Sequence, residues 1–388
     1  MYAIKDGRVL TAAGVSFAKA TVLFDEGKIL AVGENLPIPD DATVIDASGC
    51  WVTPGLIEAH SHIAVKCEPG VRGGTPDNNE VAQEPTTPQV RALDAFHPFD
   101  PGIESARKAG FTTCCVLPGS ANVIGGIGFS FKTQPKATAD EMMIPGTEVM
   151  KFALGENPRF NYGSKGKMPK TRMGVAACIR QMLFDAKNYS ERLQNAEETN
   201  TLSSFKRDFK LEALVPAVRG EMVCRFHCHR ADDIATVLRI AEEFNLKLVL
   251  DHATEGYKIS SQIAARNVPC VVGPTVSGPY KQELWGRSLE TPARLVLAGV
   301  EVALCEDAGV LTKMLPVHVG LCIKNGLSHE QALQCVTRNA AHILGLDDRL
   351  GTLECGKDAD LAIFDGDPFC NYTNCLYTIV NGTVFKNI

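Results

Sequence analysis

Short apolar runs separated by turn residues occupy the first part of the chain. Glu26-Gly27 separates the apolar run Thr21–Phe24 from Ile29–Val32, and Asp6-Gly7 follows Tyr2–Ile4. An acidic residue followed by glycine between two apolar runs is typical of a tight β-hairpin turn. Residues 1 to about 53 therefore predict β-hairpins, one with its turn at Asp6-Gly7 and one with its turn at Glu26-Gly27.

The last 35 residues show the same pattern. Apolar runs at 361–364, 377–380 and 383–385 are separated by Asp365-Gly366-Asp367-Pro368 and by Asn381-Gly382. Because an isolated hairpin is only marginally stable, neither end has enough strands to form a core alone. We therefore expect both ends to fold together as one small β domain.

The middle of the chain has a different pattern, in which apolar strand-like runs alternate with stretches of helical period. Helices are predicted at 231–244, 257–266 and 292–298, and a long one at 328–344 that begins with the capping box Ser328-x-x-Gln331 and ends before Gly345. The strand-like runs are Phe111–Leu117, Gly146–Ala153, Met222–Cys228, Leu246–His252, Val268–Val272 and Val300–Cys305.

Strands that alternate with helices over 300 residues predict an α/β fold with a parallel sheet covered by helices. This pattern does not distinguish a closed barrel from an open sheet. A glycine-rich dinucleotide fingerprint and a P-loop are both missing, which disfavours nucleotide binding. Residues 68–101 are rich in Gly, Pro, Thr and Asp and predict a long loop of the kind that often carries function.

The composition disfavours several classes of protein function. The chain has 388 residues, of which 45% are hydrophobic and 22% charged, and its formal net charge is −6. A mildly acidic chain is a poor binder of nucleic acid or anionic membranes. We also expect no membrane span, because no apolar run approaches the ~18–20 residues that one needs.

The cysteines and the N-terminus together predict a cytoplasmic protein. The 14 cysteines are scattered and often lie inside apolar runs, and the first residues have neither a basic nor an apolar segment of a signal peptide. The cysteines also form no CxxC pair, so a structural zinc ribbon is not expected. We interpret them as reduced thiols packed as small hydrophobic side chains.

Candidate chemistry begins at His60-Ser61-His62, at the end of the apolar run Val52–Ala59. Residues i and i+2 of a strand point to the same face, so both imidazoles could reach one metal ion. Two surface histidines would give the same pattern. The metal interpretation gains support because four further strand-like runs end in Lys151, His227, His252 and Asp307. The carboxyl ends of parallel strands converge at one mouth, where these side chains would meet.

Lys151 is unusual in this set because an ammonium group has no lone pair for a metal. It could be an ordinary solvated lysine at the end of a strand. As a metal ligand it would have to lose its proton and capture CO₂ as a carbamate, and burial near cations would favour that loss. The carbamate would behave as a carboxylate and could bridge two metals.

At this point the chain resembles the amidohydrolase superfamily of metal-dependent hydrolases. Val52–His62 is similar to the family's first-strand motif, Gly146–Lys151 to the strand with a carboxylated lysine in the prolidase-like, imidazolonepropionase-related branch, and Gly351–Leu361 to the closing segment. His227-x-His229 is similar to the fifth-strand motif of that branch. The resemblance implies a (β/α)8 TIM barrel at 54–353 and a small β-sandwich formed by 1–53 and 354–388.

The resemblance also implies a centre of one or two metals, usually zinc. His60 and His62 would bind one metal with Asp307, His227 and His252 would bind a second, and carboxylated Lys151 would bridge them. Asp307 would also be catalytic, and His229 is expected to act on the substrate or to orient another ligand. The chain departs from the family pattern here, because Glu306 precedes Asp307 and the histidine that usually follows is missing. This departure affects the expected substrate contacts and not the expected metal ligands. Further candidates for substrate binding are Ser120, Asn122, Arg230 and Glu255.

The preferred hypothesis is a metal-dependent amidohydrolase that uses a metal-activated water to cleave a C–N bond. A cyclic amide, an N-acyl amino acid and a dipeptide all remain open as its small-molecule substrate. The first alternative is a mononuclear deaminase of the same superfamily, which would not need Lys151. The second is a non-catalytic scaffold, although such proteins typically lose ligands that this chain retains. A homo-oligomer is expected because symmetric dimers are the commonest assemblies.

Overall fold

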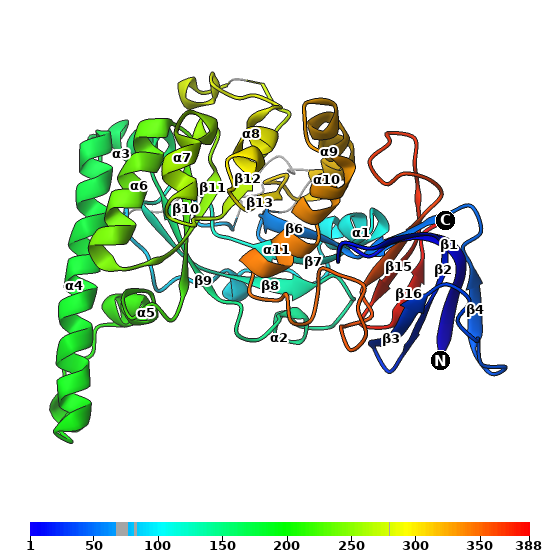
Figure 1. Cartoon of the computed structure of the whole chain (residues 1–388). Coiled ribbons are helices and arrows are strands. Elements are labelled where there is room, and N and C mark those ends of the chain that lie inside the picture. Colours follow the sequence, from blue (N-terminus) through cyan, green and yellow to red (C-terminus); the bar gives the residue numbers. More distant parts are fainter. Residues whose placement is uncertain (67–76, 81–83, 279) are drawn as a thin grey trace.

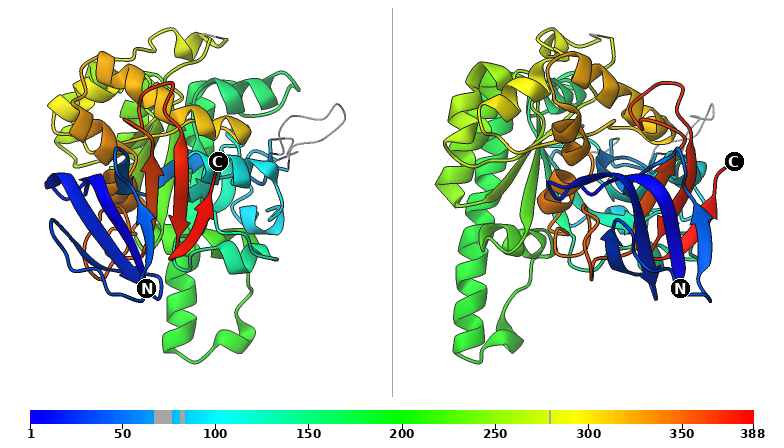
Figure 2. Two further views of the ribbon diagram at one scale, coloured as in Figure 1. Left: turned by 90° about the vertical axis from the view of Figure 1, so that its right-hand side faces the viewer. Right: turned by 45° about the vertical axis from the view of Figure 1, so that its right-hand side comes forward.

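The computed structural model describes residues 1–66, 77–80, 84–278 and 280–388. These residues form two eight-stranded sheets, one built from the chain ends and one from the middle of the chain (Figure 1). Helices pack around the middle sheet, while the terminal sheet lies beside it with both chain ends (Figure 2). The predicted loop at 68–101 lies partly outside the described residues, and its described part contains only the short 3₁₀ turn η1 (Ala92–Asp94).

The terminal sheet joins strands from both ends of the chain. Its central pairing is between β5 and β14, in which Val52 lies opposite Ile363. The strand order is β16-β15-β14-β5-β1-β2-β3, with β4 paired to β1. The strands are β1 (Tyr2–Leu10), β2 (Ser16–Asp25), β3 (Lys28–Gly33), β4 (Thr43–Asp46), β5 (Trp51–Pro54), β14 (Leu361–Phe364), β15 (Cys375–Val380) and β16 (Thr383–Lys386).

The two predicted turns behave differently. Glu26-Gly27 connects β2 to β3 as expected, with both residues at positive φ. The hairpin predicted at Asp6-Gly7 is wrong, because β1 runs through both residues and only shifts its pairing to β2 there. Asp6 has a φ of 62°, which is typical of a bulge. A Cβ on Gly7 would lie 2.8 Å from Val52 Cγ2, so glycine allows the two strands to approach.

The terminal sheet encloses a core of its own. Buried Ile4, Val22, Leu361 and Ile379 pack together in it. The β2–β3 and β15–β16 turns meet at Ala359, whose N–H donates to Gly27 O and whose carbonyl accepts from Gly382 N. The division of the chain into domains at 53/54 and 353/354 remains a prediction.

The middle sheet is nearly closed and has the strand order β13-β12-β11-β10-β9-β8-β7-β6. Its six predicted strands are present, each starting within three residues of its predicted start. The strands are β6 (Leu56–Ser61), β7 (Phe111–Val116), β8 (Ile124–Lys132), β9 (Val149–Ala153), β10 (Val223–Cys228), β11 (Lys247–His252), β12 (Cys270–Val272) and β13 (Val302–Leu304).

β8 was not predicted, and it pairs antiparallel with both β7 and β9. The expectation of an all-parallel sheet is therefore wrong at this strand. Its sequence, IGGIGFSFK, is weak as a strand because three of its residues are glycine. Gly126 has a φ of 121°, and a Cβ there would collide with the carbonyl oxygen of Val90. The absence of a side chain at Gly126 thus lets the loop before η1 lie directly on this strand.

A buried carboxylate joins the two ends of the barrel sheet, where β6 contacts β13. Glu58 is inaccessible to solvent, and its two oxygens accept the backbone N–H groups of His60 at 3.1 Å and Glu306 at 3.0 Å. Burial raises the pKa of Glu58 well above its usual value. This side chain thus links the strand that carries one pair of candidate ligands to the segment that carries Asp307.

The helices cover the outer face of the barrel, and α4 projects well beyond it (Figures 1 and 2). No described helix is long and apolar enough to cross a membrane. The helices are α1 (Pro101–Lys108), α2 (Ala139–Met142), α3 (Glu156–Gly163), α4 (Arg172–Glu198), α5 (Phe209–Val218), α6 (Ala231–Phe244), α7 (Ser260–Ala264), α8 (Thr291–Leu297), α9 (Leu315–Lys324), α10 (His329–Cys335) and α11 (Arg338–Ile343).

The predicted helix 328–344 is two helices, α10 and α11. Its capping box is present, with Ser328 and Gln331 bonded to each other's backbone. The helix breaks at Val336-Thr337 because the Val336 carbonyl accepts a hydrogen bond from Ile57 N instead of one within the helix. Residues of α11, including Ala340 and Ala341, then pack against the side chains inside the barrel.

An ion-pair cluster joins the barrel to the terminal sheet. Lys132, at the end of β8, lies 2.6 Å from Asp360 and 3.5 Å from Asp358. Asp358 also pairs with Lys28 at 2.7 Å and with Arg349 at 2.8 Å, and its side chain is only 4% exposed. Burial would raise the pKa of Asp358, but its hydrogen bonds and ion pairs with Lys28, Lys132 and Arg349 hold it below its usual value.

We expect Asp358→Asn to lower the free energy of unfolding by about 1–3 kcal/mol at pH 7, because three cations lose one carboxylate. A carboxyl whose pKa is lowered by folding stabilises the protein above its unfolded pKa of about 3.9, and this contribution is lost as the pH falls through the folded value. The difference in the free energy of unfolding between wild type and variant, measured by urea unfolding, should therefore be largest at pH 7 and decrease below pH 4. Asp94→Asn, which removes an exposed ion pair with Arg91, is the control. Equal unfolding curves for wild type and Asp358→Asn would contradict the interpretation.

Candidate metal centre

The end of β6 and the segment after β13 bring three predicted ligands together. His60 and His62 are buried, and their Nε2 atoms lie 3.3 and 3.2 Å from the same oxygen, Oδ1 of Asp307. Asp307 has a φ of 56°, a left-handed conformation that is costly for most residues. Burial would raise the pKa of Asp307, but the neighbouring His252, His60 and His62 hold it well below its usual range.

A second group lies beside the first. The ligand atoms of His227, His229 and His252 all lie within 4.8 Å of one another, and all three residues are buried. The His60 and His252 rings, one from each group, have centroids 4.8 Å apart, so the two groups are adjacent. His252 has a φ of 69°, at the point where β11 ends. Sequence reasoning set His229 apart from the other two, whereas the structure places all three together.

The imidazoles are oriented by hydrogen bonds from their Nδ1 atoms. Nδ1 lies 2.8 Å from Leu117 O in His62 and 2.6 Å from Gly273 O in His252. A carbonyl can only accept, so Nδ1 carries the proton and Nε2 keeps its lone pair. In His229, Nδ1 lies 2.7 Å from Thr254 Oγ1. This is the arrangement in which metal-binding histidines are normally held.

Several buried polar atoms at this centre have no hydrogen-bond partner among the described residues. They are Nε2 of His227, His229 and His252, Oδ1 of Asp307, Nδ1 of His60 and Oδ2 of Asp251. Burial lowers the pKa of His227 and His229 well below the usual histidine value, and that of His252 to about 3. Neutral imidazoles and a carboxylate with free lone pairs are the donor set that divalent cations bind, so these residues fit a metal.

Lys151 lies within the same centre, on β9. Its Nζ is 3.2 Å from His60 Nε2 and 3.6 Å from Asp251 Oδ2, and the side chain is 1% exposed. Burial lowers the pKa of Lys151. The structure therefore brings together all six predicted metal ligands, including the lysine.

Two buried residues at this centre were missed from the sequence. Asp251 Oδ1 lies 3.2 Å from His60 Nδ1 and 2.5 Å from an Arg225 guanidinium nitrogen, and Arg225 also donates to Ala59 O at 3.0 Å. Both side chains are inaccessible to solvent. A signal was present, since each is a charged residue within an apolar strand run that leads to a candidate ligand histidine, Arg225 two residues before His227 and Asp251 directly before His252.

The predicted substrate-binding residues occupy different surroundings. Ser120 lies at the mouth, where its Oγ accepts a hydrogen bond from Asn157 Nδ2 at 2.7 Å. Asn122 is buried and holds the fold, since its amide donates to Thr87 Oγ1 at 3.0 Å. Arg230 pairs with its neighbour Asp232. Glu255 pairs with Lys258 and accepts a hydrogen bond from the Ala231 backbone N–H at the start of α6. Each of the four side chains therefore already has a partner within the chain, and their role in substrate binding remains a prediction.

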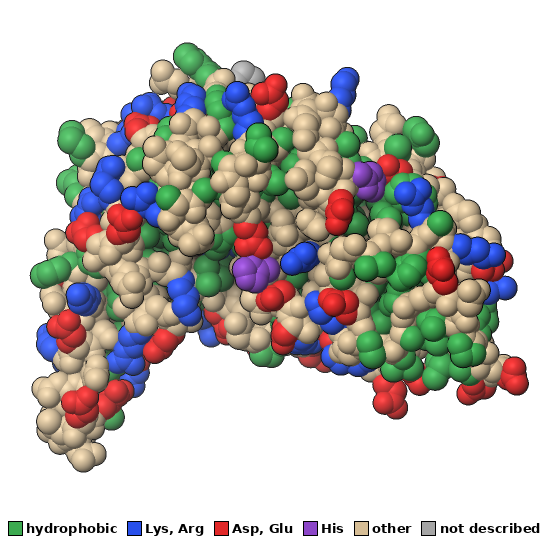
Figure 3. All heavy atoms as spheres, viewed as in Figure 1, with side chains coloured by type: hydrophobic (Ala, Val, Ile, Leu, Met, Phe, Trp, Pro, Cys, Tyr) green, Lys and Arg blue, Asp and Glu red, His purple; other side chains and the backbone are tan. Residues whose placement is uncertain are grey.

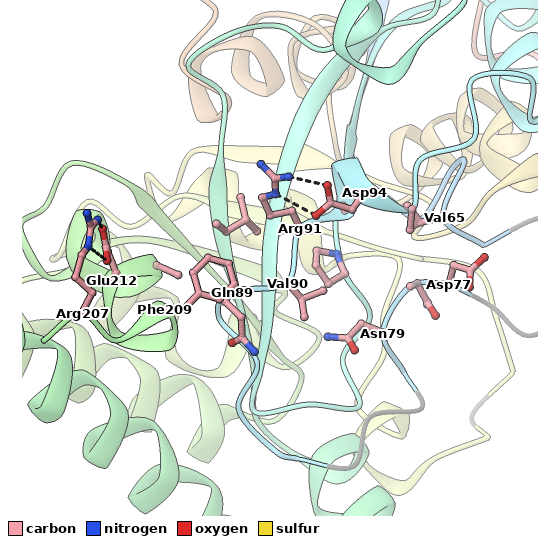
Figure 4. Close-up of a pocket in the computed structure, with 16 residues that line it drawn as sticks. Val65, Asp77, Asn79, Gln89, Val90, Arg91, Asp94, Arg207, Phe209 and Glu212 are labelled. Carbon is pink, nitrogen blue, oxygen red and sulfur yellow. Dashed lines mark hydrogen bonds and ion pairs between the residues drawn. The ribbon is translucent and has the colours of Figure 1, made fainter.

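A cavity of about 1030 Å³ lies between the loop after β6 and α5 (Figure 4). None of the six predicted metal ligands lines it. Its arginines are already paired within the lining, Arg91 with Asp94 and Arg207 with Glu212, as the dashed lines in Figure 4 show. The cavity therefore offers no convergent chemistry of its own.

The remaining histidines lie outside the metal centre. His318 bonds to Glu306 at 2.6 Å, His329 to Asp367 at 2.9 Å and His342 to Glu301 at 2.9 Å. His97 lies in the loop before α1, where its backbone N–H donates to Ala64 O. The Glu306–His318 pair explains why the acidic residue before Asp307 is tolerated. His318 satisfies the carboxylate on the side facing α9.

Three comparisons agree with this picture. Residues 190–387 match the model of the amidohydrolase family. A crystal structure of an amidohydrolase from Thermotoga maritima covers 100% of both chains, with a TM-score of 0.94 and 38% identity. Among curated proteins, amidohydrolase tasK from Hapsidospora irregularis is 30% identical over 92% of this chain, but this chain spans only 39% of tasK. Imidazolonepropionase from Streptococcus gordonii is 23% identical over 91% of this chain and 86% of its own.

We expect Asp251→Asn to weaken metal binding about 10- to 100-fold, because the amide removes the negative charge that faces His60 Nδ1. The measurement is metal content after dialysis against graded chelator. Asp232→Asn, at an exposed carboxylate on α6, is the control and should bind metal like wild type. A variant Asp251→Asn that folds normally and retains metal as wild type does would show that this carboxylate has no part in orienting the ligand.

Proposed function

Because the chain belongs to the amidohydrolase family and is a hydrolase that acts on carbon–nitrogen bonds, we propose that it cleaves an amide-type bond with a water activated at a two-metal centre. The observation that carries this proposal is the pair of adjacent donor groups, His60–His62–Asp307 and His227–His229–His252, with Lys151 beside them. Five different strand ends supply these residues, which would be unlikely without a shared ligand.

Each group has a proposed role. His60, His62 and Asp307 hold one metal, and His227 and His252 hold the other. Divalent metal, most simply zinc, would supply a Lewis acid for the substrate carbonyl and bring the pKa of water toward neutrality. Asp307 accepts the proton of the attacking water and delivers it to the leaving nitrogen. Its partnerless Oδ1 faces both His60 and His62, which supports this position.

His229 is proposed to face the substrate. Its ring stacks on His252 with centroids 4.8 Å apart, and Thr254 fixes its Nδ1. Its Nε2 lies 3.8 Å from Glu283 Oε1, on η4 (Gln282–Leu284) in the loop after β12. That loop belongs to the mouth of the barrel, where family specificity resides. A neutral imidazole here can donate or accept a hydrogen bond at the scissile group.

Lys151 is proposed to carry a carbamate. The neutral amine adds to the carbon of CO₂ and loses one proton, so the side chain changes from a potential cation to an anion with two oxygens. The support is its complete burial and its position 3.2 Å from a ligand nitrogen of His60. Two dications repel strongly, and an anionic bridge would reduce that repulsion.

The proposal includes a small-molecule amide substrate, a cytoplasmic location and a homo-oligomeric state. The curated relatives are named for different activities, and because this chain spans 39% of tasK, any activity shared with that protein is likewise a proposal. Metal analysis separates the main proposal from its alternatives. Two equivalents per chain support the hydrolase, one supports a mononuclear deaminase, and none supports a non-catalytic scaffold.

We expect Lys151→Ala to lose at least one metal and most activity, because no anion then bridges the two sites. Propionate or acetate should restore part of both by supplying a carboxylate in the vacated space. Metal content by plasma mass spectrometry and hydrolysis of an amide panel are measured together, with and without bicarbonate for the wild type. Retention of one metal with no response to carboxylic acids would favour the deaminase.

We also expect His60→Ala to abolish activity and to lower bound metal, because the cation loses an imidazole ligand. His342→Ala is the matched control, since this side chain is 60% exposed and pairs only with Glu301. His229→Ala should retain both metals yet lose activity by about 100-fold or more, as expected for a general acid–base group. Equal metal content in His60→Ala and His342→Ala would refute the ligand assignment.

A further inference from the structure

We propose that a second, smaller cavity at the mouth of the barrel binds a carboxylate group of the substrate, with Lys281 as its principal partner. This inference rests on the proposed function and adds to it the class of substrate, an amide that carries an anionic group. The cavity has a volume of about 530 Å³, and its lining includes Ala121, Asn157, Phe160 and Lys281. These residues come from the loops after β7, β9 and β12, which all open at the carboxyl end of the barrel.

The surroundings of Lys281 are those of a ligand-binding group and not those of a solvated surface lysine. Its side chain is 15% exposed, and its ammonium donates to Asn157 Oδ1 at 2.9 Å and to Glu283 Oε1 at 3.0 Å. An ammonium has three N–H donors, so one remains available. Asn157 in turn donates to Ser120 Oγ at 2.7 Å, which fixes the amide that positions the lysine.

Glu283 does not neutralise Lys281 by itself. Its carboxylate is inaccessible to solvent and is shared, since Oε2 accepts the Glu156 N–H at 2.7 Å and lies 3.8 Å from Arg172. The cation is therefore held rigidly while its charge is only partly balanced. A fixed, half-desolvated ammonium recognises a carboxylate more strongly than a free surface lysine does.

Arg159 supplies a second positive charge to the same cavity. It lies on α3, is half-buried, and has no hydrogen-bond or ion-pair partner in the part of the chain that the structure describes. Two acidic residues also line the cavity. Glu156 is occupied, because it accepts the Glu283 N–H at 3.2 Å, and Glu80 packs on Gly119. The two cations thus provide the donors that remain free for an anion.

The cavity lies directly beside the proposed metal centre. Oε1 of Glu283 is 3.0 Å from Lys281 Nζ and 3.8 Å from His229 Nε2, so a single oxygen atom separates the ammonium from the histidine group. A substrate whose carbonyl sits at that centre would place near Lys281 a carboxylate whose carbon is three bonds from the carbonyl carbon. N-acyl amino acids, dipeptides and carboxylated cyclic amides all have this spacing, whereas simple uncharged amides offer no anion to bind.

The test uses matched probe pairs that differ only in the carboxylate. These are dihydroorotate and dihydrouracil, N-acetyl-alanine and N-acetyl-alaninamide, and alanyl-proline and its amide. Hydrolysis and calorimetric binding are measured on metal-loaded wild type, Lys281→Gln and Lys281→Arg, with Lys165→Gln as the control on an exposed lysine after α3. We expect Lys281→Gln to weaken binding and raise KM about 10- to 100-fold for the preferred acid only, with metal content unchanged, and Lys281→Arg to recover much of the loss.

The outcomes separate this inference from the proposed function. If wild type cleaves no probe but binds an acid more tightly than its neutral partner, and Lys281→Gln removes that preference, the carboxylate site stands while the proposed hydrolysis of these classes fails. If wild type cleaves or binds both members of every pair equally, or binds none, the carboxylate site is wrong. Equal losses for acid and neutral probes in Lys281→Gln would also overturn it, because they would indicate a structural role.

Discussion

The interaction on which the centre depends is the buried ion pair between Arg225 and Asp251. Neither side chain reaches solvent, so each charge would cost several kcal/mol if it stood alone in the barrel. One carboxylate meets the guanidinium, His60 Nδ1 and Lys151 Nζ, which come from three different strands. Arg225 also donates to the Ala59 carbonyl, next to His60 in the chain. The pair therefore fixes the relative positions of β6, β9, β10 and β11 beneath the proposed ligands.

Above this pair, backbone geometry turns the ligands toward one another. His252 and Asp307 both have positive φ, a conformation that non-glycine residues adopt rarely and at a cost. His252 is the last residue of β11 and Asp307 follows β13, and the Nδ1 of His252 is held by Gly273 O. The strain is local, and its effect is to point side chains inward from strand ends that would otherwise face along the barrel axis.

The sequence predicted that these six side chains would lie together, because each lies at or near the end of an apolar run and the strand ends of a parallel barrel converge. Their role as metal ligands remains a proposal. It predicted β8 poorly because Gly125, Gly126 and Gly128 remove the β-branched signal, although Gly126 is what allows the loop before η1 to approach. It also joined α10 and α11, since the tertiary hydrogen bond from Ile57 to Val336 has no local signature. Arg225 and Asp251 do have a local signal, as charged residues within apolar runs, but only the fold shows that they pair. The hairpin predicted at Asp6-Gly7 was wrong because an acidic residue followed by glycine occurs both in hairpin turns and in β-bulges.

Charge balance gives a physical reason to couple lysine modification with metal entry in the proposed centre. With an ammonium at Lys151, the positive charges of Arg225 and Lys151 are matched in number by the negative charges of Asp251 and Asp307. Conversion of Lys151 to a carbamate removes one positive charge and adds one negative charge in a site from which water is excluded. That change would be strongly unfavourable alone, as would a dication placed beside two existing buried cations. Replacement of the ammonium by a carbamate lowers the charge of the centre by two, which offsets one of the two proposed dications. The proposed carbamate and at least one proposed metal should therefore be gained and lost together, while Asp251 keeps its contact with His60 Nδ1.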